Sequence, residues 1–339
     1  MNYKIAIISP TEASDVLADT IFDGLLTLRK TFPELSFYIP KEHNYITPLH
    51  LSDHELSTED FVRYAESADL IFLMFSKRFT NFALAEKINR WNKTIYIDGS
   101  ELGKNRRYDS TIQKMVLDGT FDGNGRINTE MVEKCILYFR REKPYIKSII
   151  PLPFGIESRY QQEYSKDIKK DIDFFCVFGQ DEYPQMRKHA RDLVKDFCAK
   201  NNFTCHTEVT EGFNFDAGKK SGRNEFYRLL ARSKVGISIG GGGYDTSRFW
   251  EILGNNCVLL TENIDIYTPD SNALRYDRIH QFTNIYDLDY QLKKLGAFLK
   301  DEYSQDNMGG EYDVIVKKHS SVSRVMMILE EARVKKLII

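Results

Sequence analysis

The pattern of this sequence predicts an α/β fold with two doubly wound, parallel-sheet domains. Short apolar runs alternate with longer segments of helical period, and the alternation starts again after a proline-containing stretch near the middle of the chain. The length of 339 residues fits about two domains. Because the strand candidates are uniformly apolar, we expect helices on both faces of each sheet. Two such domains joined by a hinge would face each other across a cleft.

The first half of the chain supplies four expected strands and the helices between them. The strands are expected over 4–9, 35–39, 70–74 and 94–98, and the helices over 15–30, 58–67 and 81–90. A further amphipathic helix is expected over 129–142. The stretch 146–156 follows it and contains two prolines and a glycine, so we interpret it as the crossover between the domains.

The second half repeats this organisation. Strands are expected over 172–178, 204–209, 235–239 and 258–261, helices over 184–201, 224–233 and 247–254, and two or three more helices over 286–339. The predicted domains are therefore 1–150 and 151–315, followed by a C-terminal helical segment, 316–339.

Composition and charge exclude several classes of protein. With 47 basic and 49 acidic residues the formal net charge is −2, which argues against a protein whose main task is binding nucleic-acid phosphates. The five cysteines are scattered and lack zinc-ligand spacing, so we expect reduced, packed thiols. The N-terminus does not resemble a signal peptide, and no apolar stretch approaches the roughly 18 residues of a spanning helix. We expect a cytoplasmic protein, for which peripheral membrane contact stays open.

The most informative segment is 235–262, where a buried strand is followed by four glycines and then a helix. The glycines, Gly240 to Gly243, let a backbone approach a ligand closely, and the N-terminus of the following helix offers free N–H groups and a partial positive charge. Between them lies the polar run 244–247. Arg248 adds a cation at the first helical turn, where a bare helix disfavours one, so an anion such as a diphosphate would explain it.

Glu251 follows Arg248 by three residues and therefore shares its side of the helix. A carboxylate one turn from a phosphate site can accept hydrogen bonds from both hydroxyls of a ribose. The alternative is structural: the glycines form a surface loop, and Arg248 and Glu251 form a local ion pair. The order of strand, glycines and helix favours a nucleotide-diphosphate site.

Residues 246–261 (TSRFWEILGNNCVLLT) resemble the C-terminal-domain signature of GT-B glycosyltransferases, in which an S/T-x-R-x-x-E helix precedes G-x-x-x-x-L-L-T. The closest similarity is to spore-maturation-protein (CgeB)-like and exostosin-like transferases. Looser resemblances occur at 15–25, 96–101, 138–142 and 151–155. The resemblance implies two Rossmann-like domains, with the nucleotide sugar held by the second, and a final helix that commonly crosses back to the first domain.

The resemblance also implies roles for individual residues. Glu251 would bind the ribose, and the residues that would line the diphosphate are Gly241, Gly242, Gly243, Tyr244, Ser247 and Arg248. Gly179 would border the cleft, and Arg187 would be a second phosphate cation unless it is a surface charge. In many retaining members a second glutamate lies eight residues before the ribose glutamate, but here that position is Gly243. The stereochemical outcome and the donor sugar therefore stay open.

The expected mechanism uses a preoriented helix dipole and cation to stabilise the leaving diphosphate, without a required metal or other cofactor. Two D-x-D sequences, Asp171 to Asp173 and Asp287 to Asp289, are interpreted as edge and helix-capping residues. An inverting enzyme would need a general base on the first domain, for which Asp98 and Asp15 are candidates. Their structural alternatives are a turn residue for Asp98 and a helix N-cap for Asp15.

The sequence thus predicts a metal-independent glycosyltransferase (hexosyltransferase type) that uses a nucleotide-diphosphate sugar, with a UDP-sugar favoured. The acceptor could be a glycan, a lipid, a protein or a modified base. Two alternatives remain: a non-catalytic two-domain protein that binds a nucleotide or nucleotide sugar, and a nucleotide-sugar epimerase.

Overall fold

The computed structural model describes residues 2–75, 81–100, 127–142, 148–178, 185–207, 220–241, 243–263 and 273–338. The chain divides into two compact units. The N-terminal unit comprises Met1–Gly155 together with Ser321–Ile339, and the C-terminal unit comprises Ile156–Ile264 and Asp270–Ser320. The sequence placed the domain boundary after residue 150, whereas the units divide after Gly155.

The N-terminal unit is built on a seven-stranded sheet in the order β3-β2-β1-β4-β5-β6-β7, and all of its paired strands are parallel. The strands are β1 (Lys4–Ile8), β2 (Ser36–Pro40), β3 (Glu55–Leu56), β4 (Leu70–Phe75), β5 (Thr94–Asp98), β6 (Leu137–Arg140) and β7 (Ile149–Pro151). The central strands are almost fully buried, as expected for a sheet with helices on both faces.

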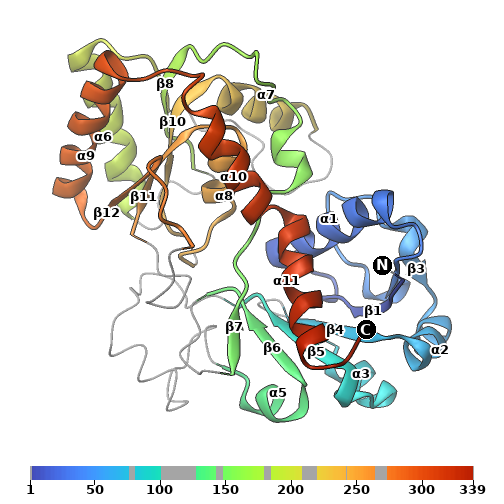
Figure 1. Cartoon of the computed structure of the whole chain (residues 1–339). Helices are drawn as coiled ribbons and strands as arrows, with labels where there is room; N and C mark the ends of the chain where they lie inside the picture. Colours follow the sequence, from blue (N-terminus) through green and yellow to red (C-terminus); the bar gives the residue numbers. More distant parts are fainter. Residues whose placement is uncertain are drawn as a thin grey trace. The chain divides into compact units, whose positions relative to one another are not determined.

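Helices cover both faces of this sheet (Figure 1). They are α1 (Val16–Thr31), α2 (Thr58–Ser67), α3 (Phe82–Ile88), α5 (Thr129–Lys134) and the C-terminal helix α11 (Ser321–Val334). Helix α11 packs on α1, and glycine makes their close approach feasible. A Cβ added at Gly24 would lie 2.5 Å from the carbonyl oxygen of Ser321.

The C-terminal unit contains a five-stranded parallel sheet in the order β12-β11-β10-β8-β9. Its strands are β8 (Ile172–Phe175), β9 (Cys205–His206), β10 (Ser233–Ser238), β11 (Val258–Glu262) and β12 (Ile279–Phe282). Its helices are α6 (Gln185–Asn201), α7 (Lys220–Ala231), α8 (Ser247–Gly254), α9 (Ile285–Asp301) and α10 (Gly309–His319). Short 3-10 helices are η1 (Lys41–His43), η2 (Ser52–His54), η3 (Trp91–Lys93) and η4 (Ser158–Gln161).

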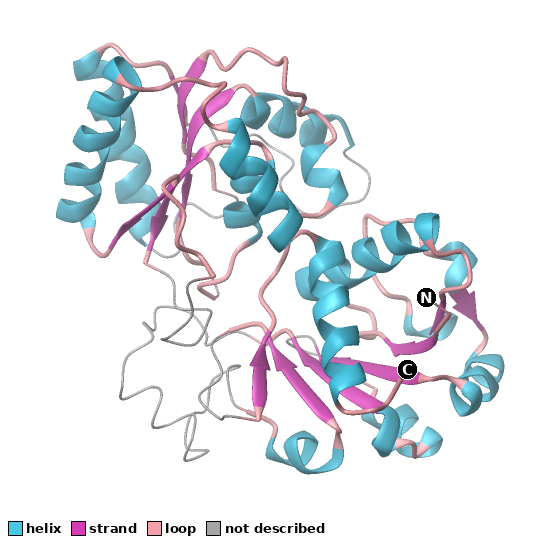
Figure 2. Cartoon of the chain, viewed as in Figure 1, coloured by secondary structure: helices cyan, strands magenta, loops and turns pink. Residues whose placement is uncertain are grey.

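Helices α6 and α9 cover one face of this second sheet, and α7, α8 and α10 lie on the other (Figures 1 and 2). Val235, Ile237 and Ile239 point from β10 and the residue after it into the core beneath α6 and α9. Gly236 faces α8 instead, and a Cβ there would lie 2.6 Å from Cγ1 of Ile252. The missing side chain therefore lets α8 pack directly against the strand.

The predicted fold class is confirmed: the protein has two α/β domains with parallel sheets and covering helices. One helix prediction was wrong. The expected helix over 129–142 ends at Lys134, and Leu137–Arg140 then form β6. All four residues of β6 are buried, so the strand shows no alternation of apolar and polar residues. A short buried helix segment has the same pattern, which explains the wrong prediction. Pro151 is tolerated in β7 because that strand lies at the sheet edge.

In the described parts of the chain, no helix has the length and apolar character that a membrane span requires.

Candidate functional site

The glycine turn follows the carboxyl end of β10, where ligands of parallel sheets commonly bind. The backbone N–H of Gly240 donates to Oε2 of Glu262 at 3.2 Å, and the N–H of Gly241 donates to the carbonyl of Gly243 at 2.9 Å. Glu262 ends the neighbouring strand β11, so the turn is anchored to the sheet. Gly242 and Gly179, two residues predicted to line the site, lie outside the described residues.

Helix α8 begins directly after this turn. Its N-cap residue, Thr246, has extended backbone angles but makes no capping hydrogen bond with its side chain. The Thr246 hydroxyl lies 3.1 Å from the Ser238 hydroxyl instead. Ser247 is the first helical residue and Tyr244 lies in the bend before the cap. The Thr246 side chain therefore does not cap the helix, whereas its backbone carbonyl accepts from the N–H of Phe249 at 3.2 Å.

Arg248 and Glu251 form an ion pair across one turn of α8. Nη1 of Arg248 lies 2.6 Å from Oε2 of Glu251, and the two side chains are only 12% and 11% exposed. The Arg248 guanidinium also stacks over the Phe226 ring at 4.0 Å. The ion pair that the sequence offered as a structural alternative is thus formed. Its burial nevertheless distinguishes it from a pair on a solvated helix face.

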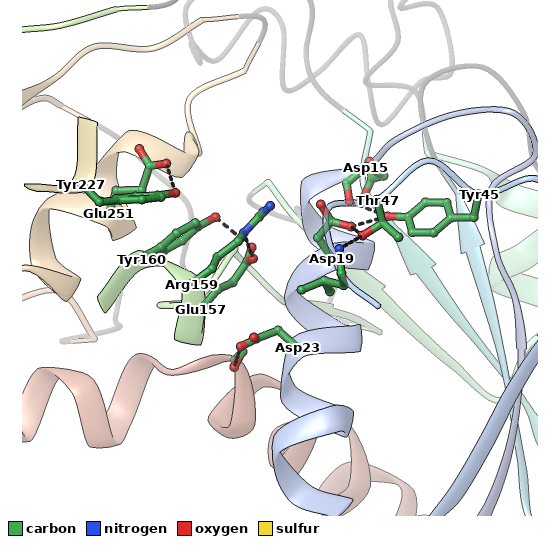
Figure 3. Close-up of polar contacts among 12 residues, drawn as sticks. Asp15, Asp19, Asp23, Tyr45, Thr47, Glu157, Arg159, Tyr160, Tyr227 and Glu251 are labelled. Carbon is green, nitrogen blue, oxygen red and sulfur yellow. Dashed lines mark hydrogen bonds and ion pairs between the residues drawn. The ribbon is translucent and has the colours of Figure 1, made fainter. Parts of the chain in front are cut away.

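Tyr227 on α7 completes the surroundings of this carboxylate. Its hydroxyl donates to Oε1 of Glu251 at 3.1 Å (Figure 3). Burial, followed by the charge of Glu251, raises the pKa of Tyr227 well above its usual value, so the phenol remains a donor at neutral pH. Each Glu251 oxygen holds one protein donor, and a carboxylate oxygen can accept a second hydrogen bond.

Arg187 lies at the glycine turn. Its Nη2 donates to the carbonyl of Ile239 at 3.1 Å, and a Cβ added at Gly241 would lie 2.6 Å from the same nitrogen. The guanidinium also lies 5.5 Å from the Phe178 ring. The sequence named Arg187 and Gly241 as independent candidates. The structure brings them together and places a cation beside the turn.

Four residues near Glu251 were missed by sequence reasoning: Glu157, Arg159, Tyr160 and Tyr227. The Tyr160 hydroxyl donates to Oε1 of Glu157 at 2.8 Å, and Nε of Arg159 lies 2.6 Å from Oε2 of the same glutamate (Figure 3). Glu157 is fully buried, and the rings of Tyr160 and Tyr227 are 6.0 Å apart. A glutamate and an arginine two residues apart just after a proline-rich crossover were a local signal for this cluster.

Asp98, a candidate general base, is occupied by neighbours in the N-terminal unit. Its Oδ2 accepts from the Tyr138 hydroxyl at 2.5 Å and from Nη1 of Arg140 at 3.1 Å, and its Oδ1 accepts from the N–H of Ser100 at 2.9 Å. The Asp98 and Arg140 side chains are 2% and 1% exposed. A buried carboxylate with these partners favours a structural role.

Asp15, the second candidate base, caps α1 by accepting from the N–H of Ala18 at 2.9 Å. This is the N-cap geometry of its structural alternative. One turn later, the buried carboxylate of Asp19 accepts from the hydroxyls of Tyr45 at 2.9 Å and Thr47 at 2.6 Å (Figure 3). The Tyr45 hydroxyl also donates to the carbonyl of Asp15 at 3.0 Å.

The acidic D-x-D pairs are held by protein partners. Asp171 pairs with Arg232 at 2.6 Å and Asp173 with Lys234 at 2.7 Å, whereas Asp287 accepts from the N–H of Thr283 at the start of α9. Within the described residues, no group of three or more His, Cys, Asp or Glu side chains has the arrangement of a metal site. Asp171 and Asp173 fit the interpretation as charged edge residues, but the N-cap of α9 is Asn284, so Asp287 and Asp289 lie within the helix and are not its N-cap.

Comparison with solved structures identifies the fold. A glycosyltransferase from Rickettsia africae superposes with a TM-score of 0.58 at 9% identity, covering 99% of this chain and 98% of that one. An alpha-glucosyltransferase in complex with UDP and a 13-mer DNA gives 0.60 at 10% identity, covering 97% and 98%. Staphylococcus aureus MnaA with UDP gives 0.50 at 10% identity, covering 100% and 98%.

These likenesses extend over nearly the whole of each chain and show a shared fold, that of two-domain GT-B glycosyltransferases. At identities near one in ten they do not define a subgroup, so the spore-maturation-protein-like and exostosin-like resemblance stays a prediction. No protein-family model matches the sequence, and no curated protein matches it either.

Proposed function

We propose that this protein is a glycosyltransferase that moves a sugar from a nucleotide-diphosphate donor, with a UDP-sugar favoured, to a hydroxyl acceptor. The proposal rests on the features that lie at the carboxyl end of β10, in the C-terminal sheet. There a glycine turn, an arginine beside it and a helix whose N-cap side chain makes no capping hydrogen bond occur together. These are the elements that bind a diphosphate without a metal.

The ribose end of the donor would reach the Glu251 carboxylate. Because Tyr227 and Arg248 hold one oxygen each, the carboxylate has a fixed orientation and one remaining acceptor site per oxygen. Two such sites match the two adjacent hydroxyls of a ribose. Arg187, Ser247 and Arg248 would line the diphosphate, together with Gly241, Gly243 and Tyr244.

In transfer, the acceptor hydroxyl attacks the anomeric carbon, the bond from that carbon to the diphosphate oxygen breaks, and the acceptor proton leaves to a base. Cations and helix N–H groups aimed at the leaving oxygen stabilise the charge that develops there, which is commonly the largest catalytic contribution. Arg187 at the turn and Arg248 at the helix start supply those groups. No metal is needed to offset that charge in this scheme.

The acceptor is proposed only as a hydroxyl compound. A glycan, a lipid, a protein or a modified base all fit. A modified base is included because one similar structure is an alpha-glucosyltransferase in complex with UDP and DNA that contains an HMU base.

A second function is favoured by one observation. Both predicted bases are engaged, Asp98 by three donors and Asp15 as a helix cap. A protein that binds the nucleotide sugar without transferring it would have the same donor site. Release of free nucleotide separates the two functions, because only catalysis or hydrolysis produces it. Conversion of the sugar within an intact donor would instead identify an epimerase.

The experiment is a thermal-shift screen of the full chain against UDP-, GDP- and ADP-sugars, followed by a nucleotide-release assay with the donor that stabilises most. We expect stabilisation by a UDP-sugar and release of UDP that rises with added acceptor. Absence of a shift with every nucleotide would contradict the donor site. A shift without release, in the presence of an acceptor panel, would favour the non-catalytic function.

A further inference from the structure

The C-terminal unit contains a cavity that the proposed donor site does not use. Its volume is about 500 Å³, within the usual range for small-molecule sites. It lies among the first residues of β11 and β12, the second half of α9 and the start of α10, and its lining includes Val258, His280, Leu295 and Glu311.

The cavity and the glycine turn lie at opposite ends of the strands of the same sheet. Val258 begins β11 and pairs in parallel with Val235 near the start of β10, and Leu259 pairs with Ile279 at the start of β12. The cavity is therefore at the amino ends of these strands, whereas the glycine turn follows the carboxyl end of β10. A ligand in the cavity would not occupy the donor site.

The inner wall of the cavity is apolar. Val258 and Leu295 belong to the buried core of the unit, Met308 and Phe298 pack against that core, and all four line the cavity. Apolar surface of this kind favours an apolar ligand body, because its burial removes hydrocarbon from water.

One polar wall is already fixed in position. The buried Arg278 donates through Nε to Glu311 at 2.9 Å and through Nη1 to Asn256 at 2.7 Å, and Nη2 donates to the carbonyl of Met308. The N–H groups of Asp277 and Arg278 also donate to Glu311. This wall is held by the protein's own bonds, so it is preorganised and would need no rearrangement to receive a ligand.

The side chains of His280 and Lys294 also border the cavity. Among the described residues, His280 and Lys294 have no hydrogen-bond or ion-pair partner. Burial, and then the nearby Lys294 charge, lower the pKa of His280, so the imidazole is a neutral donor at pH 7. Asp277 and Glu311 raise this pKa more weakly. The Lys294 ammonium and an N–H of the His280 imidazole are two donors on the same wall, which together fit one anionic group. Asp277 and Glu302 also border the cavity and are exposed, and a cationic probe shows whether they bind a cation instead.

We propose that this cavity is a second ligand site of the C-terminal unit and that it takes a small molecule with an apolar body and one anionic group, such as a carboxylate. The apolar body would lie against Leu295, Phe298 and Met308, and the anion would meet Lys294 and His280. This site would be independent of the nucleotide site.

The test is calorimetric titration of the full chain with three bicyclic probes that differ in charge: 1-naphthoate, its uncharged amide 1-naphthamide, and the cation 1-naphthylmethylammonium. We expect one naphthoate per chain, bound about tenfold more tightly than the amide, as one charge-assisted hydrogen bond would give. Saturating UDP should leave this binding intact.

Two variants and a control locate the bound probe. His280→Gln combined with Lys294→Gln should weaken naphthoate about tenfold, to the level of the amide. Ala297→Trp, which fills the cavity from an exposed position on α9, should abolish binding of both probes. Lys293→Gln is the matched control, since its ammonium pairs with Asp289 and does not line the cavity, and it should change nothing.

Any of several results would overturn the proposal. These are absence of saturable naphthoate binding, equal or tighter binding of the amide or the cation, displacement of naphthoate by UDP, and unchanged binding in the double glutamine variant. The double variant alters only side chains without partners among the described residues, so its folding is expected to match that of the parent chain.

Discussion

The two units each place charged side chains where a buried strand ends, but they use them differently. After β5, in the N-terminal unit, Asp98 is enclosed by Tyr138, Arg140 and Ser100 and is about as inaccessible as a core residue. After β10, in the C-terminal unit, Arg187 lies beside a glycine turn, and the N-cap side chain of α8 makes no capping hydrogen bond. The comparison teaches that a carboxylate at the end of a parallel strand can be enclosed by partners from the neighbouring strand, so its position alone does not make it a site residue.

The largest expected effect is a loss of stability when the buried Asp98–Arg140 ion pair of the N-terminal unit is broken. Arg140→Met removes a buried partner of Asp98, and an uncompensated buried charge typically costs about 3 kcal/mol or more. We expect the free energy of unfolding, measured by urea denaturation, to fall by about that amount while the affinity of the folded protein for UDP is unchanged.

The control for this prediction is Asp98→Asn combined with Arg140→Met, which removes both charges. It should recover part of the lost stability. If Arg140→Met instead weakened UDP binding and left stability unchanged, the Asp98 cluster would belong to a ligand site and the contrast between the units would be wrong.

The next effect sharpens the description of the C-terminal site. Arg248→Gln removes a cation at the start of α8, and we expect UDP affinity to fall about 10- to 100-fold, because charge-assisted bonds to a diphosphate are lost. Arg228→Gln is a matched control, since Arg228 pairs with Glu225 at an exposed part of α7. Isothermal titration of both variants with UDP checks the prediction. Equal affinities in the two variants would remove Arg248 from the site.

A third prediction concerns ribose recognition. If Glu251 accepts from the ribose hydroxyls, the wild-type protein should bind UDP about tenfold more tightly than 2′-deoxy-UDP, and Glu251→Gln should lose most of that preference. The measured quantity is the ratio of the two dissociation constants, which a general loss of folding would not alter selectively. A preference that persists in Glu251→Gln would assign ribose binding to another residue.

The smallest effect concerns Tyr227, which acts by holding Glu251 in position. Tyr227→Phe should weaken UDP binding about threefold to fivefold, as expected for one neutral hydrogen bond, with little change for 2′-deoxy-UDP. Tyr164→Phe is the control, because that hydroxyl accepts from Asn256 beyond the end of α8. Identical losses for both nucleotides would mean that Tyr227 acts through packing alone.

Tyrosine ionisation gives a pH dependence with a defined sign. Burial raises the pKa of Tyr160 and Tyr227 well above the usual value, so both remain protonated in the folded protein when an unfolded chain would ionise near pH 10. The contribution of these two tyrosines to the free energy of unfolding is therefore fully present below about pH 10 and declines at higher pH. Unfolding measured from pH 9 to 11 should show this decline, with a smaller slope in Tyr227→Phe. An unchanged slope would show that Tyr227 ionises equally in both states.

Sequence patterns predicted the local parts of this structure well. Helix α8 occupies the expected residues 247–254, and three helices follow in the C-terminal tail. The i,i+3 spacing of Arg248 and Glu251 predicted a shared helix face, but it could not decide between an ion pair and a ligand site, because both need the same spacing. The structure shows the ion pair and adds its burial.

The parts that sequence could not supply depend on contacts between distant positions. Tyr227 meets Glu251 from another helix, and Arg187 reaches the glycine turn from α6, so neither contact leaves a periodic signal. The same limit explains β6, where a short apolar run has no period long enough to separate strand from helix. The enclosure of Asp98 could not be predicted either, because its partners Tyr138 and Arg140 lie on that mispredicted segment.

The most direct test of the central claim is hydrogen–deuterium exchange of the full chain with and without saturating UDP, read by mass spectrometry. Nucleotide binding at the edge after β10 predicts slower amide exchange in peptides that cover residues 239–251, with no change in peptides that cover β5 and Asp98. Unchanged exchange over 239–251 while UDP binds, or protection confined to the N-terminal unit, would contradict it.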